Sequence, residues 1–283
     1  MLLAWSSLQI PSLRSIFKYS GNYLFIILFI FFLFSITSLI IFVKKPGFFI
    51  FLSKSYWPWV TMIFVITIIV YYIYPIADGL KSINRGSDQD DGLIQGAIVI
   101  LKGISPYSVT TYLGNPISAG PGWIILLLPL SAFNLYWVIT PLSLLILIYS
   151  NYLSGRSIYY TNILICLLCS SLAFWEVLVV GSDFIAFSAL LVALGNLIVR
   201  FKDSIFILLL IALIVGMLST ARVFFIITPF VYSFLFWPYS KLKTILFCLT
   251  SLTICLMFHI LFYLNSEVYS PLHLITKSTF IMH

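Results

Sequence analysis

Charge is scarce in this chain of 283 residues: 8% of its residues are Asp, Glu, Lys or Arg, whereas 62% are hydrophobic. Soluble domains carry about 25% charged residues, so the composition excludes an ordinary water-soluble fold. The mean hydropathy of +1.14 and the long apolar runs instead predict a polytopic membrane protein. We therefore expect an all-α fold, a transmembrane helical bundle that forms a single domain over residues 1–283.

Motifs of several enzyme classes are also lacking. The sequence has no P-loop, dinucleotide fingerprint, GxSxG or HExxH, which argues against an NTP-driven pump, a lipase-type hydrolase and a zinc protease. The four cysteines lie in apolar segments, where we interpret them as packing residues. The net charge of +7 comes from basic residues dispersed in short loops, a pattern that indicates membrane topology and argues against nucleic-acid binding.

Apolar runs predict about eight membrane segments. The run 122–153 is too long for one upright helix and contains Pro129 and Pro141, so we expect either a kinked span or a re-entrant piece plus a span. The eight runs are 22–43, 57–76, 122–153, 158–180, 184–199, 204–220, 223–238 and 244–264.

The distribution of charge predicts the topology of a multi-pass plasma-membrane or inner-membrane protein. If 122–153 makes one net crossing, most loop lysines and arginines fall inside, as the positive-inside rule requires. Seven of the eight acidic residues then lie at the outer face, and only Asp203 lies inside. The arrangement also puts Arg14 and Lys18 outside, against the rule, unless residues 1–43 do not cross the membrane as one simple span. The basic residues that fall inside are Lys44, Lys45, Lys54, Arg156, Arg200, Lys202, Lys241 and Lys243.

The largest polar stretch, 77–121, is the predicted outer loop. We expect Ser87 to cap a short helix whose first turn carries acidic residues. The segment from Gly92 to Leu101 is apolar enough to lie in the membrane interface, and Gly103 is suited to end the helix. The Pro- and Gly-rich remainder should fold over the spans as an irregular loop.

Three aspartates crowd into four positions of this loop, at Asp88, Asp90 and Asp91. They could be a solvated helix N-terminus or a reactive site. Packed carboxylates repel one another, so one holds its proton more tightly than a lone Asp does, which suits a general base near neutral pH. Their oxygens could also bind a divalent cation, with Asp88 and Asp90 as the candidate ligands.

The order of motifs over about 57–264 resembles the GT-C superfamily, integral-membrane glycosyltransferases that use polyprenyl-phosphate sugars, and is closest to its mannosyltransferase-like branch. Members usually continue through further C-terminal spans. The resemblance rests on the aspartate cluster in the first outer loop, the amphipathic helix after it, Gly103-x-Ser105-Pro106-Tyr107, Val180-Gly181-Ser182-Asp183, and Leu218-Ser219-Thr220-Ala221-Arg222 before an apolar run that ends at Pro229.

The resemblance implies transfer of a hexose, such as mannose, with inversion at the extracytoplasmic face. The donor would be a lipid-linked sugar and the acceptor a glycan, a lipid or a protein. Asp88 or Asp90 would be the base, and Asp91 would orient it or hold a metal ion. No cofactor beyond such a cation is expected.

Other residues are weaker candidates for the same site. Arg222 could bind the donor phosphate or simply reach the membrane interface. Asp183 could contact the acceptor or cap the helix that follows it, and Glu176 could be functional or interfacial. Tyr107 and Asn115 are candidate acceptor contacts because they share the loop with the aspartates.

Two other functions remain open from the sequence. A transporter or lipid-carrier flippase should place charges at mid-membrane and repeat its helices in two halves, whereas these charges avoid the mid-membrane and no such symmetry is evident. A non-catalytic subunit that keeps the fold and works with a partner subunit is the other, because the C-terminal region is short for the family.

Overall fold

Helices account for all the regular structure in the part of the chain that the structure describes. This computed structural model describes residue 33 and residues 57–83, 86–155, 161, 168–169, 171–266 and 269. Within these ranges no strand occurs, and one isolated antiparallel bridge joins Thr110 and Pro116. The predicted all-α class is therefore confirmed. Apart from residue 33, the predicted span 22–43 lies outside the described residues, and so does the first half of 158–180 apart from residues 161 and 168–169.

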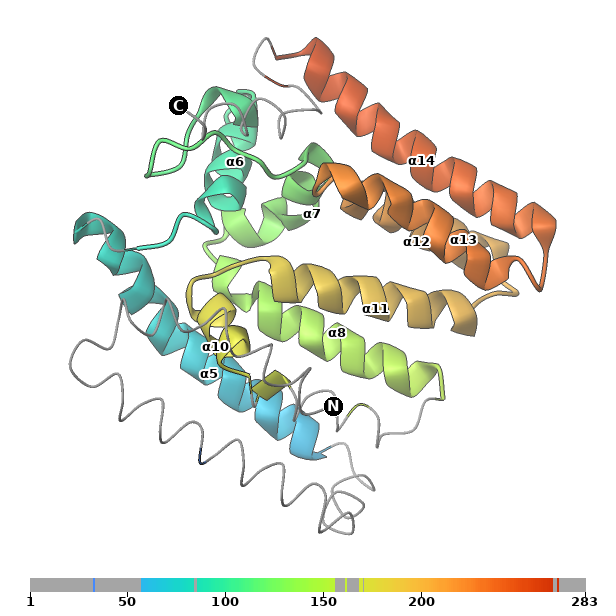
Figure 1. The fold of residues 1–283 in the computed structure, drawn as a ribbon, viewed down its shortest axis with the longest axis horizontal. Coiled ribbons are helices and arrows are strands. Elements are labelled where there is room, and N and C mark those ends of the chain that lie inside the picture. The colour runs from blue at the N-terminus through green and yellow to red at the C-terminus, as the bar shows by residue number, and fades with distance from the viewer. Residues whose placement is uncertain are drawn as a thin grey trace.

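The helices follow the predicted apolar runs closely, because those runs are bounded by Gly, Pro and polar residues that end helices. The α-helices are α5 (Trp57–Gly79), α6 (Asp91–Leu101), α7 (Pro121–Ala132), α8 (Ile139–Leu153), α10 (Leu172–Val179), α11 (Phe184–Arg200), α12 (Ile205–Ser219), α13 (Thr228–Phe236) and α14 (Lys241–Leu264) (Figure 1). Short 3-10 helices are η3 (Leu80–Ile83), η4 (Pro106–Ser108), η5 (Tyr136–Val138) and η6 (Val223–Ile227).

Three of these helical segments are long and apolar enough to cross a membrane: Trp59–Ile83, Tyr136–Leu153 and Lys241–Leu264. A fourth is added if α10 and α11, which meet at a bend of 107°, count as one broken span. Membrane insertion is thus supported, but the described residues contain fewer full-length spans than predicted. The reason is length, because several apolar runs form helices shorter than the roughly 20 residues that a crossing needs.

The long run 122–153 forms two separate helices, α7 and α8. The chain turns between them at Asn134, whose φ of 56° lies in the left-handed region that asparagine tolerates better than most residues. The alternative of a short piece plus a span therefore describes the chain here, and a single kinked helix does not. α7 packs against α6 and α12, whereas α8 packs against α11 and α5 (Figure 1).

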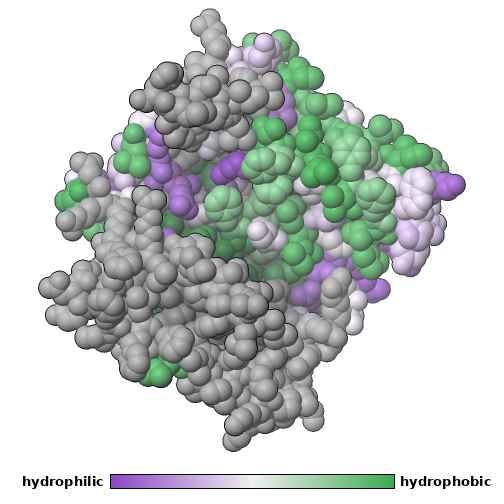
Figure 2. All heavy atoms as spheres, in the orientation of Figure 1, coloured by the Kyte–Doolittle hydropathy of each residue, from purple (hydrophilic) through white to green (hydrophobic). Residues whose placement is uncertain are grey.

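Two buried apolar clusters hold the helices together. The first surrounds Trp123 of α7 and includes Leu93 of α6 and Leu218 of α12. The second lies among α5, α8, α10 and α11 and includes Trp59 and Phe174. Outside these clusters, Figure 2 shows a broad hydrophobic surface over α12, α13 and α14, while hydrophilic side chains gather near the beginning of α6 and at the start of α14. An apolar exterior of this extent is what a lipid environment accommodates.

Candidate functional site

A cavity of about 170 Å³ lies where the beginning of α6, the loop after η4, the α10–α11 turn and the segment after α12 meet. Four of the predicted site residues line it: Asp88, Asn115, Asp183 and Arg222. A cavity needs about 10–15 Å³ by this measure to hold one water molecule, so this one is about ten times larger or more. The cavity therefore has room for one small polar group, such as a sugar ring or a phosphate.

Asp88 is held in the cavity wall by the loop that folds over it. Its Oδ2 accepts hydrogen bonds from Thr111 Oγ1 at 2.9 Å and from Asn115 Nδ2 at 2.7 Å. Within the described ranges, no group donates a hydrogen bond to Oδ1 of Asp88. This carboxylate is thus oriented through one oxygen and can use the other toward a ligand.

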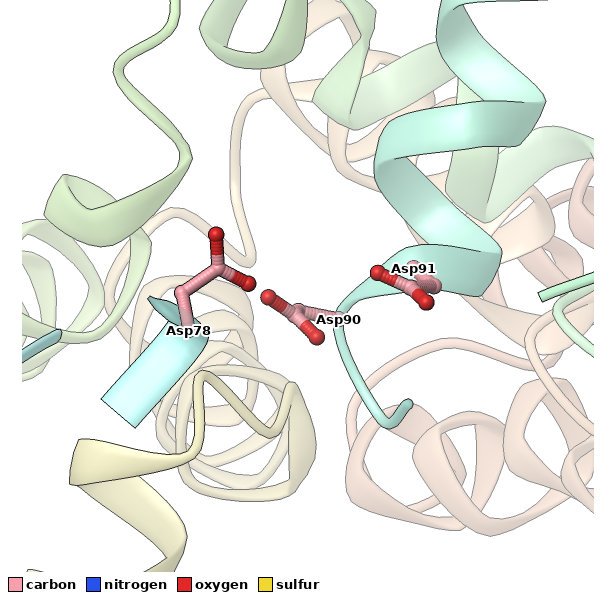
Figure 3. Close-up of side chains that lie close together, drawn as sticks. All are labelled: Asp78, Asp90 and Asp91. Atoms are coloured by element: carbon pink, nitrogen blue, oxygen red, sulfur yellow. The ribbon is translucent and has the colours of Figure 1, made fainter. Parts of the chain in front are cut away.

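Asp90 and Asp91 face a different partner, Lys81. Asp78 at the end of α5, Asp90 just before α6 and Asp91 at its start bring their carboxylates toward one another (Figure 3). The ammonium Nζ of Lys81 lies 2.5 Å from Asp78 Oδ1, 2.9 Å from Asp90 Oδ1 and 2.6 Å from Asp91 Oδ1. We refer to these four residues as the Lys81 cluster.

The carboxylates that could hold a metal ion differ from the predicted pair of ligands. Oxygens of Asp78, Asp90 and Asp91 all lie within 4.8 Å of one another, which is the spacing of a cation site. However, the lysine ammonium already supplies positive charge there, and Asp88 is not a member of the group. The predicted pair of ligands, Asp88 and Asp90, is therefore not the set that the fold gathers.

Asp90 is almost completely buried, with 1% of its surface exposed. Its Oδ2 accepts a hydrogen bond from Tyr74 Oη at 2.5 Å, so Tyr74 and Lys81 together occupy both of its oxygens. Burial raises the pKa of Asp90, while the hydrogen bonds from Tyr74 and Lys81 act in the opposite direction. Because Asp90 does not line the cavity, it is placed to support the site from behind.

Asp91 anchors the loop that covers the cavity. While Oδ1 binds Lys81, Oδ2 accepts a hydrogen bond from the backbone N–H of Tyr112 at 3.0 Å. The Tyr112 hydroxyl in turn donates to the carbonyl of Gly86 at 2.7 Å. Asp91 therefore fixes the segment from which Thr111 and Asn115 reach Asp88.

The start of α6 differs from the prediction. Asp90 is the N-cap residue and makes no side-chain capping bond, and the Ser87 hydroxyl accepts only a long hydrogen bond of 3.4 Å from the N–H of Gln89. The prediction that Ser87 caps the helix is wrong, because Asp90 occupies the N-cap position. Asp90 does not cap the helix with its side chain either, since its carboxylate binds Tyr74 and Lys81. Gly103 does follow the end of the helix, with φ of 71°.

Arg222 is brought to the cavity by the end of α12, which packs tightly against the start of α7. The backbone N–H of Trp123 donates to Thr220 Oγ1 at 3.1 Å, and that of Gly120 donates to the Ala221 carbonyl at 3.2 Å. A Cβ at Gly120 would lie 1.6 Å from the Thr220 carbonyl oxygen, so only glycine fits there. This contact sets the position of the residue that follows, Arg222.

Asp183 links three elements around the cavity. Its Oδ2 accepts a 2.7 Å hydrogen bond from Trp123 Nε1, and its Oδ1 lies 3.8 Å from Arg222 Nη2. Asp183 occupies the N-cap position of α11 but makes no side-chain capping bond. Of the two predicted roles, the structure therefore removes the side-chain cap and leaves a carboxylate in the cavity wall.

The turn between α10 and α11 depends on Gly181, which has φ of 69°. A Cβ there would lie 2.6 Å from the Tyr74 ring and 3.1 Å from Asp90 Cβ. The Gly181 carbonyl also accepts a hydrogen bond from Tyr136 Oη at 2.9 Å. The Lys81 cluster thus packs directly behind the turn that carries Ser182 and Asp183 to the cavity.

Tyr107 and Glu176, like Asp90 and Asp91, lie outside the cavity lining. Tyr107 is buried, donates its hydroxyl hydrogen to the Ala119 carbonyl at 3.0 Å, and stacks on Tyr269 with ring centroids 4.1 Å apart. Burial raises the pKa of Tyr107 well above its usual value, so the phenol stays protonated. Glu176 is half-buried on α10 and is also not among the residues that line the cavity.

Sequence reasoning gave no role to Lys81, Tyr74, Trp123 or Ser182. Lys81 and Ser182 had a local signal: Lys81 follows Asp78 by three residues at a helix end, a spacing that brings opposite charges together, and Ser182 directly precedes the predicted Asp183. Tyr74 and Trp123 join the site through contacts between segments far apart in the chain.

No protein-family model, curated protein or solved structure matches this chain. Its family is therefore not shown by likeness. What bears on function is the chemistry of the cavity and of the short motifs around it.

Proposed function

We propose that this chain is an integral-membrane glycosyltransferase of GT-C type, which moves a hexose from a polyprenyl-phosphate donor to an acceptor at the extracytoplasmic face. One observation carries the proposal: the carboxylate of Asp88 and the guanidinium of Arg222 line the same small polar cavity. A sugar transfer from a lipid phosphate needs a base for the acceptor and a positive charge for the leaving group. These two side chains supply both.

The reaction is a single displacement at the anomeric carbon. The acceptor hydroxyl gives its proton to Oδ1 of Asp88 as its own oxygen bonds to the anomeric carbon. The bond between that carbon and the phosphate oxygen breaks, and polyprenyl phosphate leaves with the electron pair. Arg222 stabilises the departing phosphate through charge-assisted hydrogen bonds, and the anomeric configuration is inverted because the attack comes from the opposite side.

The surroundings of Arg222 favour a lipid-linked phosphate over a soluble one. η6 begins directly after Arg222 and is entirely apolar, and its Phe224 and Ile227 are 64% and 60% exposed. In a membrane, such side chains face lipid and can accompany an isoprenoid tail. A phosphate bound at Arg222 would therefore have its lipid chain beside this surface.

The distribution of charge supports the proposed topology. Lys243 Nζ, at the start of α14, donates hydrogen bonds to the carbonyls of Lys202 at 2.8 Å and Asp203 at 3.2 Å. The α11–α12 and α13–α14 connections, where the basic residues gather, therefore lie together. The cavity lies at the opposite ends of α11 and α12, at Asp183 and Arg222. Basic connections inside and the cavity outside is the arrangement that the positive-inside rule favours.

The test is sugar transfer in membranes that contain the chain, with polyprenyl-phosphate hexoses labelled in the sugar. Asp88→Asn should lower transfer by about 100-fold or more, since a general base contributes 10² to 10⁴ in rate. Arg222→Ala should raise the donor concentration needed for half-maximal transfer. Asp203→Asn and Arg200→Ala, at the opposite ends of α12 and α11, are the matched controls and should retain activity.

Full activity of Asp88→Asn would exclude Asp88 as the base. Binding of the lipid-linked sugar without any transfer, by wild type and controls alike, would instead favour a non-catalytic subunit that needs a partner. No binding at all would contradict the assignment to this substrate class.

A further inference from the structure

Ser182 is a buried hydroxyl that the proposed reaction does not use. It lies in the α10–α11 turn, is 1% exposed and lines the cavity beside Asp183. Within the described part of the chain, no group hydrogen bonds to its Oγ. Buried hydroxyls are nearly always hydrogen-bonded, so a hydroxyl in a cavity wall without a partner among the described residues is available to a ligand that enters the cavity.

The backbone around Ser182 is fixed, so the hydroxyl is held in place. The Ser182 N–H donates to the Val177 carbonyl at 3.0 Å, and the preceding carbonyl accepts from Tyr136 Oη at 2.9 Å. The next residue, Asp183, is held by Trp123. The turn thus presents a rigid pair of groups to the cavity, one hydroxyl and one carboxylate oxygen.

This pair suits a sugar better than it suits a phosphate. Carboxylate oxygens accept hydrogen bonds from sugar hydroxyls, and a serine hydroxyl can both donate and accept. A phosphate next to Asp183 would be repelled by its negative charge and would move toward Arg222 instead. Because Arg222 Nη2 lies 3.8 Å from Asp183 Oδ1, the sugar and the phosphate of one donor would bind next to each other.

We propose that Ser182 is a specificity-determining residue, which hydrogen bonds to a hydroxyl of the transferred hexose while Asp183 accepts from a neighbouring hydroxyl. The inference rests on the proposed function, because it assumes that a hexose occupies the cavity. Sites built to pair a ligand hydroxyl discriminate strongly against ligands that present it differently, because the polar group of the protein then stays unpaired. Ser182 should therefore influence which hexose is bound.

The experiment compares S182A with S131A in the full-length protein, purified into lipid nanodiscs. Ser131 of α7 is the matched control, because its hydroxyl is also buried without a partner in the described structure but does not line the cavity. The probes are a short-chain polyprenyl phosphate and the same lipid carrying mannose, glucose or galactose. Equilibrium binding is measured for each, and the unfolding temperature is measured without added lipid.

We expect wild type to bind at least one hexose-bearing lipid more tightly than the sugar-free lipid. S182A should weaken binding of that lipid by about 3- to 10-fold, the worth of one hydrogen bond, and leave sugar-free binding unchanged. S131A should change neither. The unfolding temperature of S182A should not fall, because the removed hydroxyl bonds to no described group of the protein.

Three results would overturn the inference. If wild type prefers one hexose and S182A keeps that preference in full, Ser182 is not a sugar contact, although the proposed function stands. If S182A lowers the unfolding temperature and weakens both kinds of lipid equally, its role is structural. If wild type binds no hexose-bearing lipid more tightly than the sugar-free lipid, the inference and the proposed donor class both fail.

Discussion

The indole N–H of Trp123 donates a 2.7 Å hydrogen bond to the carboxylate of Asp183, a residue 60 positions later in the chain. Both side chains are buried. The bond joins the start of α7 to the α10–α11 turn and leaves the second oxygen of Asp183 toward Arg222, 3.8 Å from its guanidinium. One tryptophan thereby sets the direction of a carboxylate in the cavity wall.

Trp123→Phe should therefore impair the site more than the fold. A hydrogen bond to a charged group contributes about 1.5–3 kcal/mol, and its loss leaves Asp183 free to turn toward Arg222. Weaker binding of the lipid-linked donor is the expected result, measured together with thermal unfolding. Trp59→Phe is the matched control, because Trp59 is equally buried but its indole nitrogen has no partner in the described structure. Equal effects of the two substitutions on binding would contradict the role given to Trp123.

Lys81→Met should destabilise the protein strongly. It removes the cation between Asp78, Asp90 and Asp91, and leaving buried charges uncompensated costs about 3–5 kcal/mol. Adding Asp90→Asn should restore part of the lost stability, because it removes one of the repelling charges. Unfolding in detergent measures both effects.

The control for the lysine substitution is Lys102→Met, since Lys102 is exposed at the end of α6. Surface substitutions of this kind change stability by about 0.5 kcal/mol or less. If Lys81→Met and Lys102→Met have the same stability, the Lys81 cluster does not hold the site together.

Gly181→Ala should abolish donor binding, because its Cβ would collide with the Tyr74 ring and Asp90 and displace the turn that carries Ser182. Gly155→Ala is the comparison, since Gly155 has a similar φ of 65° but open space around its Cβ position. Both variants carry a backbone cost of about 1–2 kcal/mol for the left-handed conformation. Only Gly181→Ala should lose binding, and equal losses in the two would show that backbone strain alone is responsible.

The stability of the protein should depend on pH through Asp90. Burial raises the pKa of this carboxyl, so the folded state binds its proton more tightly than the unfolded state does. Its contribution to the free energy of unfolding is therefore greatest at low pH and is lost as the pH rises through the raised value. Asp90→Asn cannot ionise and should flatten this decline in unfolding measurements between about pH 4 and 8. Parallel pH curves for wild type and Asp90→Asn would contradict this expectation.

Labelling of single cysteines tests the topology. Leu113 in the loop over the cavity and Leu242 at the start of α14 are 53% and 67% exposed, so a thiol at either position is accessible. In a background without the native cysteines, Leu113→Cys should react with an impermeant reagent from the extracytoplasmic side and Leu242→Cys only after the membrane is opened. Labelling of both from one side would overturn the arrangement.

Much of the helical structure could be predicted from local sequence. The apolar runs at 184–199 and 204–220 correspond within a residue or so to α11 and α12, because runs of apolar helix formers bounded by polar residues determine where a helix begins and ends. The number of crossings was not predictable in this way. The run 223–238, for example, contains Pro229 and divides into η6 and a short α13. Hydropathy does not predict this division, because it measures the apolar content of a segment and not the direction in which the segment packs.

The candidate site, like the helices, could be predicted only in part from the sequence. Composition identified the acidic cluster as unusual, because charged groups beside apolar spans are costly and therefore few. Asp183 and Arg222 were predicted from the motifs that resemble the GT-C superfamily. Which aspartate faces the cavity was decided only by tertiary contacts. Asp88 and Asp90 are two positions apart, yet one is bound by Thr111 and Asn115 in the cavity wall and the other is buried against Tyr74 and Lys81.

Local sequence alone thus predicts a helical, membrane-compatible chain with few acidic residues, because hydropathy and helix boundaries are local properties. Tertiary contacts place Lys81 among three of those acids, direct Asp183 through Trp123, and leave the Ser182 hydroxyl in the cavity wall without a partner among the described residues. Each of these depends on where a side chain from one segment meets another segment. In a low-dielectric interior, the energy of a charge or a hydroxyl is set by such neighbours and not by its position in the sequence.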